Sequence, residues 1–556
     1  MGINHTIDFE KIETEVKKLL YSYLEVQSLT NSENEKKVED FFLSHFSRIK
    51  YFKEKPDSYG LYKIDGDAYD RSVCWAMVRG IGKDTVVMVH HYDVVGVEDF
   101  KALKDFAFKP DELRKQLLEN MDMLQEDAKK DLMEDTFIFG RGGADMKAGG
   151  SIQYSLLEEY SELDNFIGNV IVIGVPDEEN LSAGMRGAVK LLANLKEKYG
   201  LDYKMMINSE PHQRKDFSKG VFSVGSVGKL MPFVYVRGFL SHAGKVFEGF
   251  NPVNLMAEIT RETELNMEFA DVVGSENAPP PTWLYLKDSK VSYDVSMPLS
   301  AAGCFSVLTL KQTPEELLEK VENVITAAFD KVIKEMNVSY KRFLANTKQE
   351  QELLPWSTKV VNFKQLYEEA KGNYGIKFTE EYDKKVNSLA KLVRSGALPI
   401  IESNFKLIEF IYDFIDDISP KVVYGLIPPY YPSVSNLAYE DSDEKVRTLC
   451  DLLTMYSEES FSQSYTKEYF YTGISDLSYT YIKDANKIKE SLEKSMPLFG
   501  KMYDIPLKEI SDISMPCINI GPWGKDFHKL TERVNKEDVC IRTPKILDRA
   551  IKIILG

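Results

Sequence analysis

The chain has 556 residues, of which 43% are hydrophobic and 28% are charged, as in ordinary globular proteins. This length exceeds what one compact core supports, so we expect two or more domains. The formal net charge is −17 at pH 7 with no basic stripe to offset it, which excludes nucleic acid as a partner.

The cysteines and the N-terminal residues indicate the compartment. The five cysteines form no Cys-x-x-Cys pair, so neither a thiolate zinc site nor a dithiol redox motif is expected, and their odd number argues against a disulfide framework. Met1-Gly-Ile-Asn-His has no basic segment followed by an apolar core, so no signal peptide is predicted. No apolar run approaches the roughly 18 residues of a membrane helix. We therefore expect a cytoplasmic protein with no membrane partner.

The first part of the chain alternates helices and strands. Apolar residues at helical spacing predict a helix over Asp8 to Val26, and β-type runs predict strands at Val73 to Val78 and Thr85 to His90. Residues 100–133 are charged and mixed, and within them we expect a helix from Asp111 to about Leu132.

A run of β-branched residues, Val170 to Val175, predicts a buried strand. Pro176 ends it, because proline has no N–H to donate, and Asp177, Glu178 and Glu179 follow at once. A solvated acidic turn is the simplest interpretation of such a triplet. At the mouth of a buried strand, however, three like charges are costly unless a cation lies nearby.

Ligand-type side chains follow the carboxyl ends of several predicted strands. His91 follows one strand, Glu178 and Glu179 follow another, Glu210 follows a third, and Asp145 lies in a glycine-rich turn before a helix. Alternating strands and helices predict a largely parallel sheet with helices on both faces. Ligands bind such sheets at the carboxyl ends of the strands. This convergence of carboxylates and imidazole favours a metal site.

The pattern changes after Lys219. Strands without intervening helices, followed by helix and strand in mixture, predict an α+β unit, and residues 346–418 are predicted to be mostly helical. A strand is expected at Lys421 to Leu426 and another at Pro516 to Pro522, with His528 after its end.

Six segments, taken together and in this order, resemble the M20 family of metallopeptidases, a group of two-metal aminoacyl hydrolases. They are His91-Tyr-Asp93-Val-Val, Gly140-Arg-Gly-Gly-Ala-Asp145-Met-Lys-Ala-Gly, Pro176-Asp-Glu178-Glu179, Ser209-Glu210-Pro, Gly238-Phe-Leu-Ser-His242-Ala-Gly, and Gly521-Pro-Trp to His528. The length, the segment Pro428-Pro-Tyr-Tyr-Pro and the large late insertion are most similar to the RocB type, the arginine-utilisation branch.

The resemblance implies an α/β fold: a zinc-exopeptidase-like catalytic domain, with a mixed, largely parallel sheet and helices on both faces, and an inserted α+β lid domain. The catalytic domain would comprise residues 1–218 and 437–556. The lid would comprise residues 219–436, with a helical insertion at about 346–418.

The resemblance also implies a site for two zinc ions, with manganese or cobalt as alternatives. His91, Asp145 and Glu210 would hold one ion. Asp145, Glu179 and His528 would hold the other, so that Asp145 bridges the two. A shared carboxylate suits two cations about 3.5–4 Å apart.

Three further residues receive catalytic roles from the resemblance. Glu178 would be the general base, taking a proton from a metal-bridging water that then attacks the amide carbonyl. Asp93 would accept a hydrogen bond from His91 and fix its tautomer. His242, from the lid, would hydrogen-bond the developing oxyanion.

The implied function is hydrolysis of an amide bond in a small peptide or an N-acyl amino acid, with a link to arginine catabolism. The alternative is a non-catalytic binding or regulatory protein on a metallohydrolase fold. Assembly as a monomer or as a lid-mediated homodimer stays open. After the strand Phe305 to Leu310 the chain lacks the arginine that relatives use for a substrate carboxylate, so carboxypeptidase specificity is not predicted.

Overall fold

The computed structural model describes residues 7–214 and 216–556. The chain divides into two compact units. The first comprises Met1–Val227, Val434–Lys483 and Pro506–Gly556, and the second comprises Gly228–Ser433 and Asp484–Ile505. Among the helices of the described ranges, none is long and apolar enough to cross a bilayer.

The first unit is built on an eight-stranded sheet. Its strands lie in the order β1 (Tyr59–Lys63), β2 (Ser72–Arg79), β5 (Ile167–Val175), β3 (Ile81–His91), β6 (Asp202–Asn208), β19 (Cys517–Asn519), β7 (Lys219–Ser223) and β18 (Ser464–Glu468). The central pairs β5/β3, β3/β6 and β6/β19 are parallel, whereas β1/β2, β2/β5 and β19/β7 are antiparallel. The predicted mixed, largely parallel sheet is confirmed.

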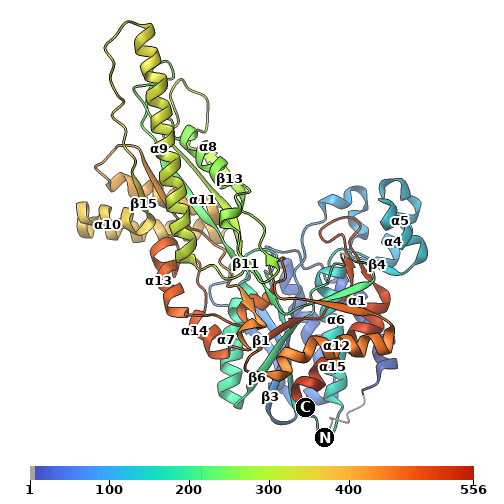
Figure 1. The fold of residues 1–556 in the computed structure, drawn as a ribbon. Helices are drawn as coiled ribbons and strands as arrows, with labels where there is room; N and C mark the ends of the chain where they lie inside the picture. Colours follow the sequence, from blue (N-terminus) through green and yellow to red (C-terminus); the bar gives the residue numbers. More distant parts are fainter. Residues whose placement is uncertain (1–6, 215) are drawn as a thin grey trace. The chain divides into compact units, whose positions relative to one another are not determined.

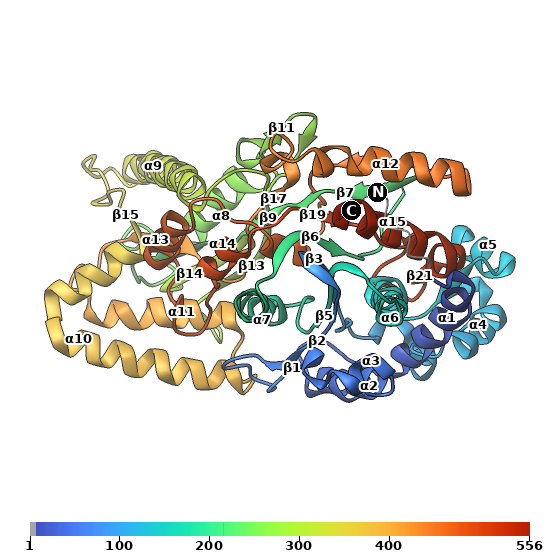
Figure 2. The same ribbon diagram turned by 90° about the horizontal axis from the view of Figure 1, so that it is seen from below.

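Helices cover both faces of this sheet (Figure 2). The helices α6 (Ala148–Ser161) and α15 (Thr543–Leu555) pack on one face, and α7 (Ala183–Tyr199) packs on the other. Along β3, Val86 and Met88 join the core under α6 and α15, while Val87, on the opposite side, is equally buried. Burial on both faces explains why these strands are continuous apolar runs rather than alternating ones.

Further helices complete the first unit. The helix α1 (Phe9–Glu25) packs on α6, and Asp8 caps its N-terminus by accepting hydrogen bonds from two backbone N–H groups. The helix predicted from Asp111 to about Leu132 is in fact two helices, α4 (Pro110–Glu119) and α5 (Glu126–Glu134). Residues 120–125 separate them and include a short 3-10 helix, Met121–Met123. This link contains apolar residues of its own, so the apolar pattern of the sequence does not show the break.

The second unit is an α+β structure (Figure 1). Its main sheet has the order β13 (Thr282–Asp288), β14 (Ser300–Thr309), β10 (Pro232–Arg237), β16 (Lys421–Leu426) and β15 (Val360–Asn362), and β9 (Gly228–Leu230) pairs with β14. The helices α10 (Phe363–Arg394) and α11 (Ile400–Ile411) form the predicted helical insertion, and they share a core with β10 and β16. The helices α8 (Pro252–Thr263) and α9 (Pro314–Asn346) contact the same sheet.

The two units differ from the predicted domain limits in three places. Residues 219–227, which include β7, and residues 434–436 belong to the first unit instead of the lid, and residues 484–505 belong to the second unit. The helix α13 (Ala485–Ser495) belongs to the second unit, where it contacts α9, α10 and β16. The predicted limits put this helix in the C-terminal part of the catalytic domain. The elements that α13 contacts all end at Leu426 or earlier in the sequence, so sequence order alone could not assign it.

Candidate metal centre

The first component of the site is His91, the last residue of β3. Its Nδ1 lies 3.0 Å from the backbone carbonyl oxygen of Asp93, which can only accept, so Nδ1 carries a proton. Nε2 faces Asp145 Oδ1 at 2.9 Å and Glu210 Oε1 at 3.5 Å. The strand end and this hydrogen bond together orient the imidazole toward two carboxylates.

Asp93 has a different contact from the predicted one. Its carboxylate lies 3.6 Å from His91 Nδ1, which is beyond hydrogen-bond distance, and the main-chain carbonyl orients the ring instead. The Asp93 carboxylate accepts the backbone N–H groups of Glu178 at 3.1 Å and Glu179 at 3.2 Å. This fully buried side chain therefore ties the end of β3 to the acidic loop after β5.

Asp145 lies between the two histidines of the site. Its Oδ1 is 2.9 Å from His91 Nε2, and its Oδ2 is 3.2 Å from His528 Nε2. Glu179 Oε1 is 2.9 Å from the same His528 nitrogen. The structure therefore brings together the five predicted ligands, with Asp145 in the shared position, and the donor atoms of His91, Asp145 and Glu179 lie within 4.8 Å of one another.

A small sheet brings His528 to Asp145. The strand β21 (Arg533–Asn535) pairs with β4 (Phe137–Phe139) and with β20 (Gly524–Lys525). The Asp145 turn follows β4, and His528 lies in the loop between β20 and β21. Strand pairing thus joins two segments that are far apart in the sequence.

Glu532, which was not predicted from the sequence, holds the Asp145 turn. Glu532 is buried, and its Oε1 accepts the backbone N–H groups of Ala144 and Asp145, each at 3.3 Å. Its Oε2 pairs with the buried guanidinium of Arg141 at 2.6 Å. No sequence motif marks this glutamate, because its partners lie almost 400 residues away.

The loop after β5 is also held from behind. Asp177 has a left-handed backbone with φ of 69°, which is unfavourable for a residue with a side chain. Its carboxylate accepts the backbone N–H of Ala183 and pairs with Arg71 at 2.9 Å. The loop conformation that projects Glu178 and Glu179 therefore depends on these buried contacts.

A buried polar chain lies behind His91 and Glu210. His90 donates from Nδ1 to Gln153 Oε1 at 2.9 Å, and Gln153 donates to the backbone carbonyl of Val89 at 2.7 Å and to Ser209 Oγ at 2.9 Å. His90 was predicted to be a packing residue, and in the structure it also donates a hydrogen bond to Gln153. Gln153 links the ends of β3 and β6, the strands that precede His91 and Glu210.

The electrostatics of the site show an excess of buried negative charge. Burial raises the pKa of Glu178 and of Glu210 well above the usual glutamate range, and neighbouring carboxylates raise both further. Contacts with Asp145 and Glu179 raise the pKa of His528 to about 10. Within the described ranges, no lysine or arginine forms an ion pair with any of these carboxylates. Apart from the two histidines, no cationic side chain of the described residues compensates these carboxylates, so the site favours bound cations.

Three other polar residues border the centre. Asp476, to which no role was assigned, is buried, and no hydrogen bond reaches either of its carboxylate oxygens from the described residues. Burial raises the pKa of Tyr471, as do Glu210 and Asp145, which places a phenol beside the carboxylates. Lys147 does not neutralise them: its Nζ donates to the carbonyl oxygens at the end of α1, at 2.6 and 3.1 Å.

His242 belongs to the second unit. Its side chain is exposed, and its Nδ1 accepts the backbone N–H of Gly244 at 3.0 Å. The proton of the neutral ring is therefore on Nε2, which has no partner among the described residues. The residue is free to donate a hydrogen bond from this atom.

The chain is similar to proteins of one metallopeptidase family. The profile of peptidase family M20/M25/M40 matches residues 118–552. YqjN of Bacillus subtilis, an uncharacterized protein, is 31% identical over 524 residues, covering 93% of this chain and 92% of YqjN. RocB of the same organism is 28% identical over 545 residues, covering 96% and 93%. The M20 family metallo-carboxypeptidase Sso-CP2 of Sulfolobus solfataricus superposes with a TM-score of 0.52 at 11% identity, over 97% of this chain and 99% of that one.

Proposed function

The chain belongs to peptidase family M20/M25/M40, whose members are metal-dependent hydrolases, and we propose that it hydrolyses an amide bond in a small peptide or an N-acyl amino acid. The predicted family and fold class are confirmed by these matches. The observation that supports the proposed reaction is the convergence of five ligand-type side chains around Asp145.

The donor set fits two divalent cations. In the proposal, His91, Asp145 and Glu210 hold one ion, and Asp145, Glu179 and His528 hold the other. Imidazole nitrogen with carboxylate oxygen suits zinc, and manganese or cobalt are alternatives. The buried carboxylates described above have no lysine or arginine partner within the described ranges, so cations would relieve their repulsion. When bound, such ions act as Lewis acids toward the scissile carbonyl and toward water.

Glu178 is the proposed general base. Its backbone N–H is anchored on Asp93, and no side chain or backbone N–H in the described ranges donates to its carboxylate. Its neighbour Glu179, anchored in the same way, contacts His528. Of two adjacent carboxylates, one is therefore engaged and the other is left to accept a proton from the attacking water.

His242 is the proposed donor to the oxygen on which negative charge develops. Its free Nε2–H is the correct donor for that role, since the acceptor Nδ1 is already used by Gly244. Replacement of His242 by alanine should lower kcat more than it raises KM, because the interaction strengthens only in the transition state.

The proposed substrate is a class of compound, small peptides and N-acyl amino acids. The likeness to RocB supports a link to arginine catabolism, so N-acyl-arginine and arginine-containing dipeptides are the first compounds to screen. The alternative of a non-catalytic binding protein would not require a free carboxylate at Glu178.

The decisive test is Glu178→Gln, with metal content and turnover measured on the same preparation. We expect about two ions per chain in both proteins and a loss of roughly 10²–10⁴-fold in kcat, the usual contribution of a general base. Glu493→Gln, on the exposed face of α13, is the matched control. Full activity of Glu178→Gln on a substrate that the wild type cleaves would disprove the assignment.

A further inference from the structure

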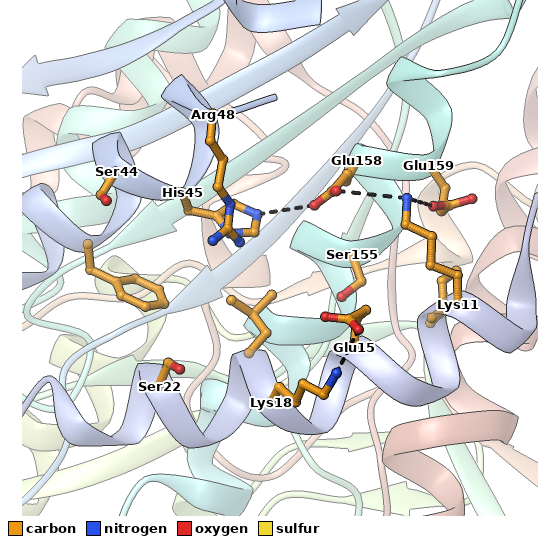
Figure 3. Close-up of a pocket in the computed structure, with 13 residues that line it drawn as sticks. Lys11, Glu15, Lys18, Ser22, Ser44, His45, Arg48, Ser155, Glu158 and Glu159 are labelled. Atoms are coloured by element: carbon orange, nitrogen blue, oxygen red, sulfur yellow. Dashed lines mark hydrogen bonds and ion pairs between the residues drawn. The ribbon is translucent and has the colours of Figure 1, made fainter. Parts of the chain in front are cut away.

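A second cavity lies in the first unit, between α1, α6 and α2 (Lys37–Ser47) (Figure 3). Its volume is about 400 Å³, within the range of small-molecule sites. None of its lining residues belongs to the metal centre. The lining is Lys11, Ile12, Glu15, Lys18, Leu19, Ser22, Phe41, Ser44, His45, Arg48, Ser155, Glu158 and Glu159.

Arg48 is the cation of this cavity that has no carboxylate partner. Within the described ranges it forms no ion pair within 4 Å, whereas Lys11 pairs with Glu159 at 2.7 Å and Lys18 pairs with Glu15 at 2.8 Å. Its Nη2 donates to His45 Nδ1 at 2.8 Å. This bond leaves the other guanidinium N–H groups available to an anion, and a guanidinium binds a carboxylate through two parallel hydrogen bonds.

His45 holds Arg48 in place. The imidazole is 4% exposed, and burial, together with Arg48, lowers its pKa to about 3, so the ring is neutral. Since arginine only donates, Nδ1 is the acceptor and the proton is on Nε2. The ring thus presents an acceptor to Arg48 on one side and an N–H toward Glu158 on the other (Figure 3).

Glu158 is the carboxylate that lacks a donor. It lies 3.8 Å from His45 Nε2 and 3.8 Å from Lys11 Nζ, both beyond hydrogen-bond distance. Its side chain is 29% exposed, and no donor in the described ranges reaches its carboxylate oxygens within hydrogen-bond distance. The cavity therefore contains a guanidinium without a carboxylate partner and, at the other end of the His45 ring, a carboxylate whose ion pair with Lys11 is long, at 3.8 Å, and which receives no hydrogen bond from the described residues.

We propose that this cavity binds a free α-amino acid with an apolar side chain. Arg48 would receive the α-carboxylate and Glu158 the α-ammonium group, while Ile12, Leu19 and Phe41 provide apolar contact. A lone anion such as phosphate would meet Glu158 and its neighbouring carboxylates, and a lone cation would meet Arg48. Only a zwitterion satisfies both groups.

The cavity also contacts the aromatic residues behind the metal centre. His45 stacks on Tyr154 with ring centroids 5.7 Å apart, and Tyr154 packs edge-on against His90 at 5.0 Å. His90 directly precedes His91. Amino acids are products of the proposed amide hydrolysis, so the cavity is suited to sense them. That link rests on the proposed function, whereas binding itself does not.

The test is calorimetric titration of the metal-loaded full chain carrying Glu178→Gln, which prevents hydrolysis of the ligands, with L-leucine, N-acetyl-L-leucine and L-leucinamide. The two derivatives lack the ammonium charge and the carboxylate charge, respectively. We expect leucine to bind with a millimolar or lower Kd and each derivative to bind at least about tenfold more weakly, as expected for losing one charge-assisted hydrogen bond. Equal binding of all three compounds would contradict recognition of a zwitterion.

Variants locate the binding site. Arg48→Gln and Glu158→Gln should each weaken leucine binding by about tenfold. The melting temperature should stay unchanged in Glu158→Gln and fall slightly in Arg48→Gln, because only Arg48 donates a short hydrogen bond, to His45. Arg447→Gln, an exposed arginine on another helix of the same unit, should leave binding unchanged. Leucine binding that persists in Arg48→Gln and Glu158→Gln but is lost in His91→Ala would place it at the metal centre and refute the proposal. So would the absence of heat at millimolar leucine.

Discussion

Arg71 offers the most direct test of how the acidic loop is held. Its guanidinium contacts Glu35 at 2.7 Å, Asp67 at 2.6 Å and Asp177 at 2.9 Å. The side chain of Arg71 is 4% exposed, and those of its three partners are at most 3% exposed. Glu35 also accepts the backbone N–H of Asp177 at 2.9 Å. The Arg71 guanidinium therefore compensates three buried carboxylates, and one of them, Asp177, directly precedes Glu178.

We predict that Arg71→Met destabilises the first unit strongly. Removing one partner of a buried ion pair costs roughly 3–5 kcal/mol, because the remaining charge is left without compensation. Three carboxylates lose their partner here, but proton uptake limits the cost, so about 4 kcal/mol is a reasonable value. At roughly 2–4 °C per kcal/mol for large domains, the melting temperature should fall by roughly 8–16 °C.

The assay is thermal unfolding of the metal-loaded protein, with metal content measured after dialysis. Arg79→Met is the matched control: Arg79 lies at the exposed end of the same strand region, over the ring of Tyr199, and its loss should cost less than about 0.5 kcal/mol. Metal retention should fall in Arg71→Met alone. A melting temperature equal to that of Arg79→Met would refute the view that this cluster supports the loop.

Three further predictions follow from other contacts. Glu532→Gln keeps an acceptor for the Asp145 turn but loses the charge facing Arg141, so metal affinity should fall about 10–100-fold. Competition with a chelating dye measures this affinity, and Glu537→Gln, at an exposed position, is the control. Equal affinity of the two variants would argue against a role for Glu532 in the site. Removing metal with a chelator should lower the melting temperature, since ions at 100 times their Kd contribute about 2.7 kcal/mol, and an unchanged transition would contradict the proposed site. Burial lowers the pKa of His45 from 6.5 to about 3, so below pH 6.5 the unfolded chain binds a proton that the folded chain does not. Stability is then lost as pH falls from 6.5 toward 3, by up to about 1.4 kcal/mol per pH unit, and His45→Phe should reduce this slope in urea unfolding between pH 6 and pH 4. An identical slope in both proteins would show that His45 titrates normally.

The central sheet and the order of the ligand-bearing segments could be predicted from the sequence. The apolar runs of β3 and β5 mark strands buried on both faces, and Pro176 marks where β5 ends. Because the carboxyl ends of parallel strands lie at one edge of the sheet, His91, Glu179 and Glu210 were expected to lie close together, and donor atoms of His91 lie near both glutamates. Local pattern and a general rule of sheet topology suffice for this part of the site.

Contacts between distant segments required the tertiary structure. Glu532 reaches the Asp145 turn because β21 pairs with β4, and Arg71 reaches Asp177 because β2 pairs with β5. Neither pairing leaves a local signal.

The division of roles within single residues also depended on tertiary structure. A two-residue offset suggested that the Asp93 carboxylate orients His91, whereas the main-chain carbonyl of Asp93 takes that bond and the carboxylate binds the loop after β5. The sequence by itself determined which chemical groups are present and which strand ends carry them. Only the tertiary structure decided which buried donors and acceptors pair, because that depends on distances between segments that hydrophobic periodicity does not encode.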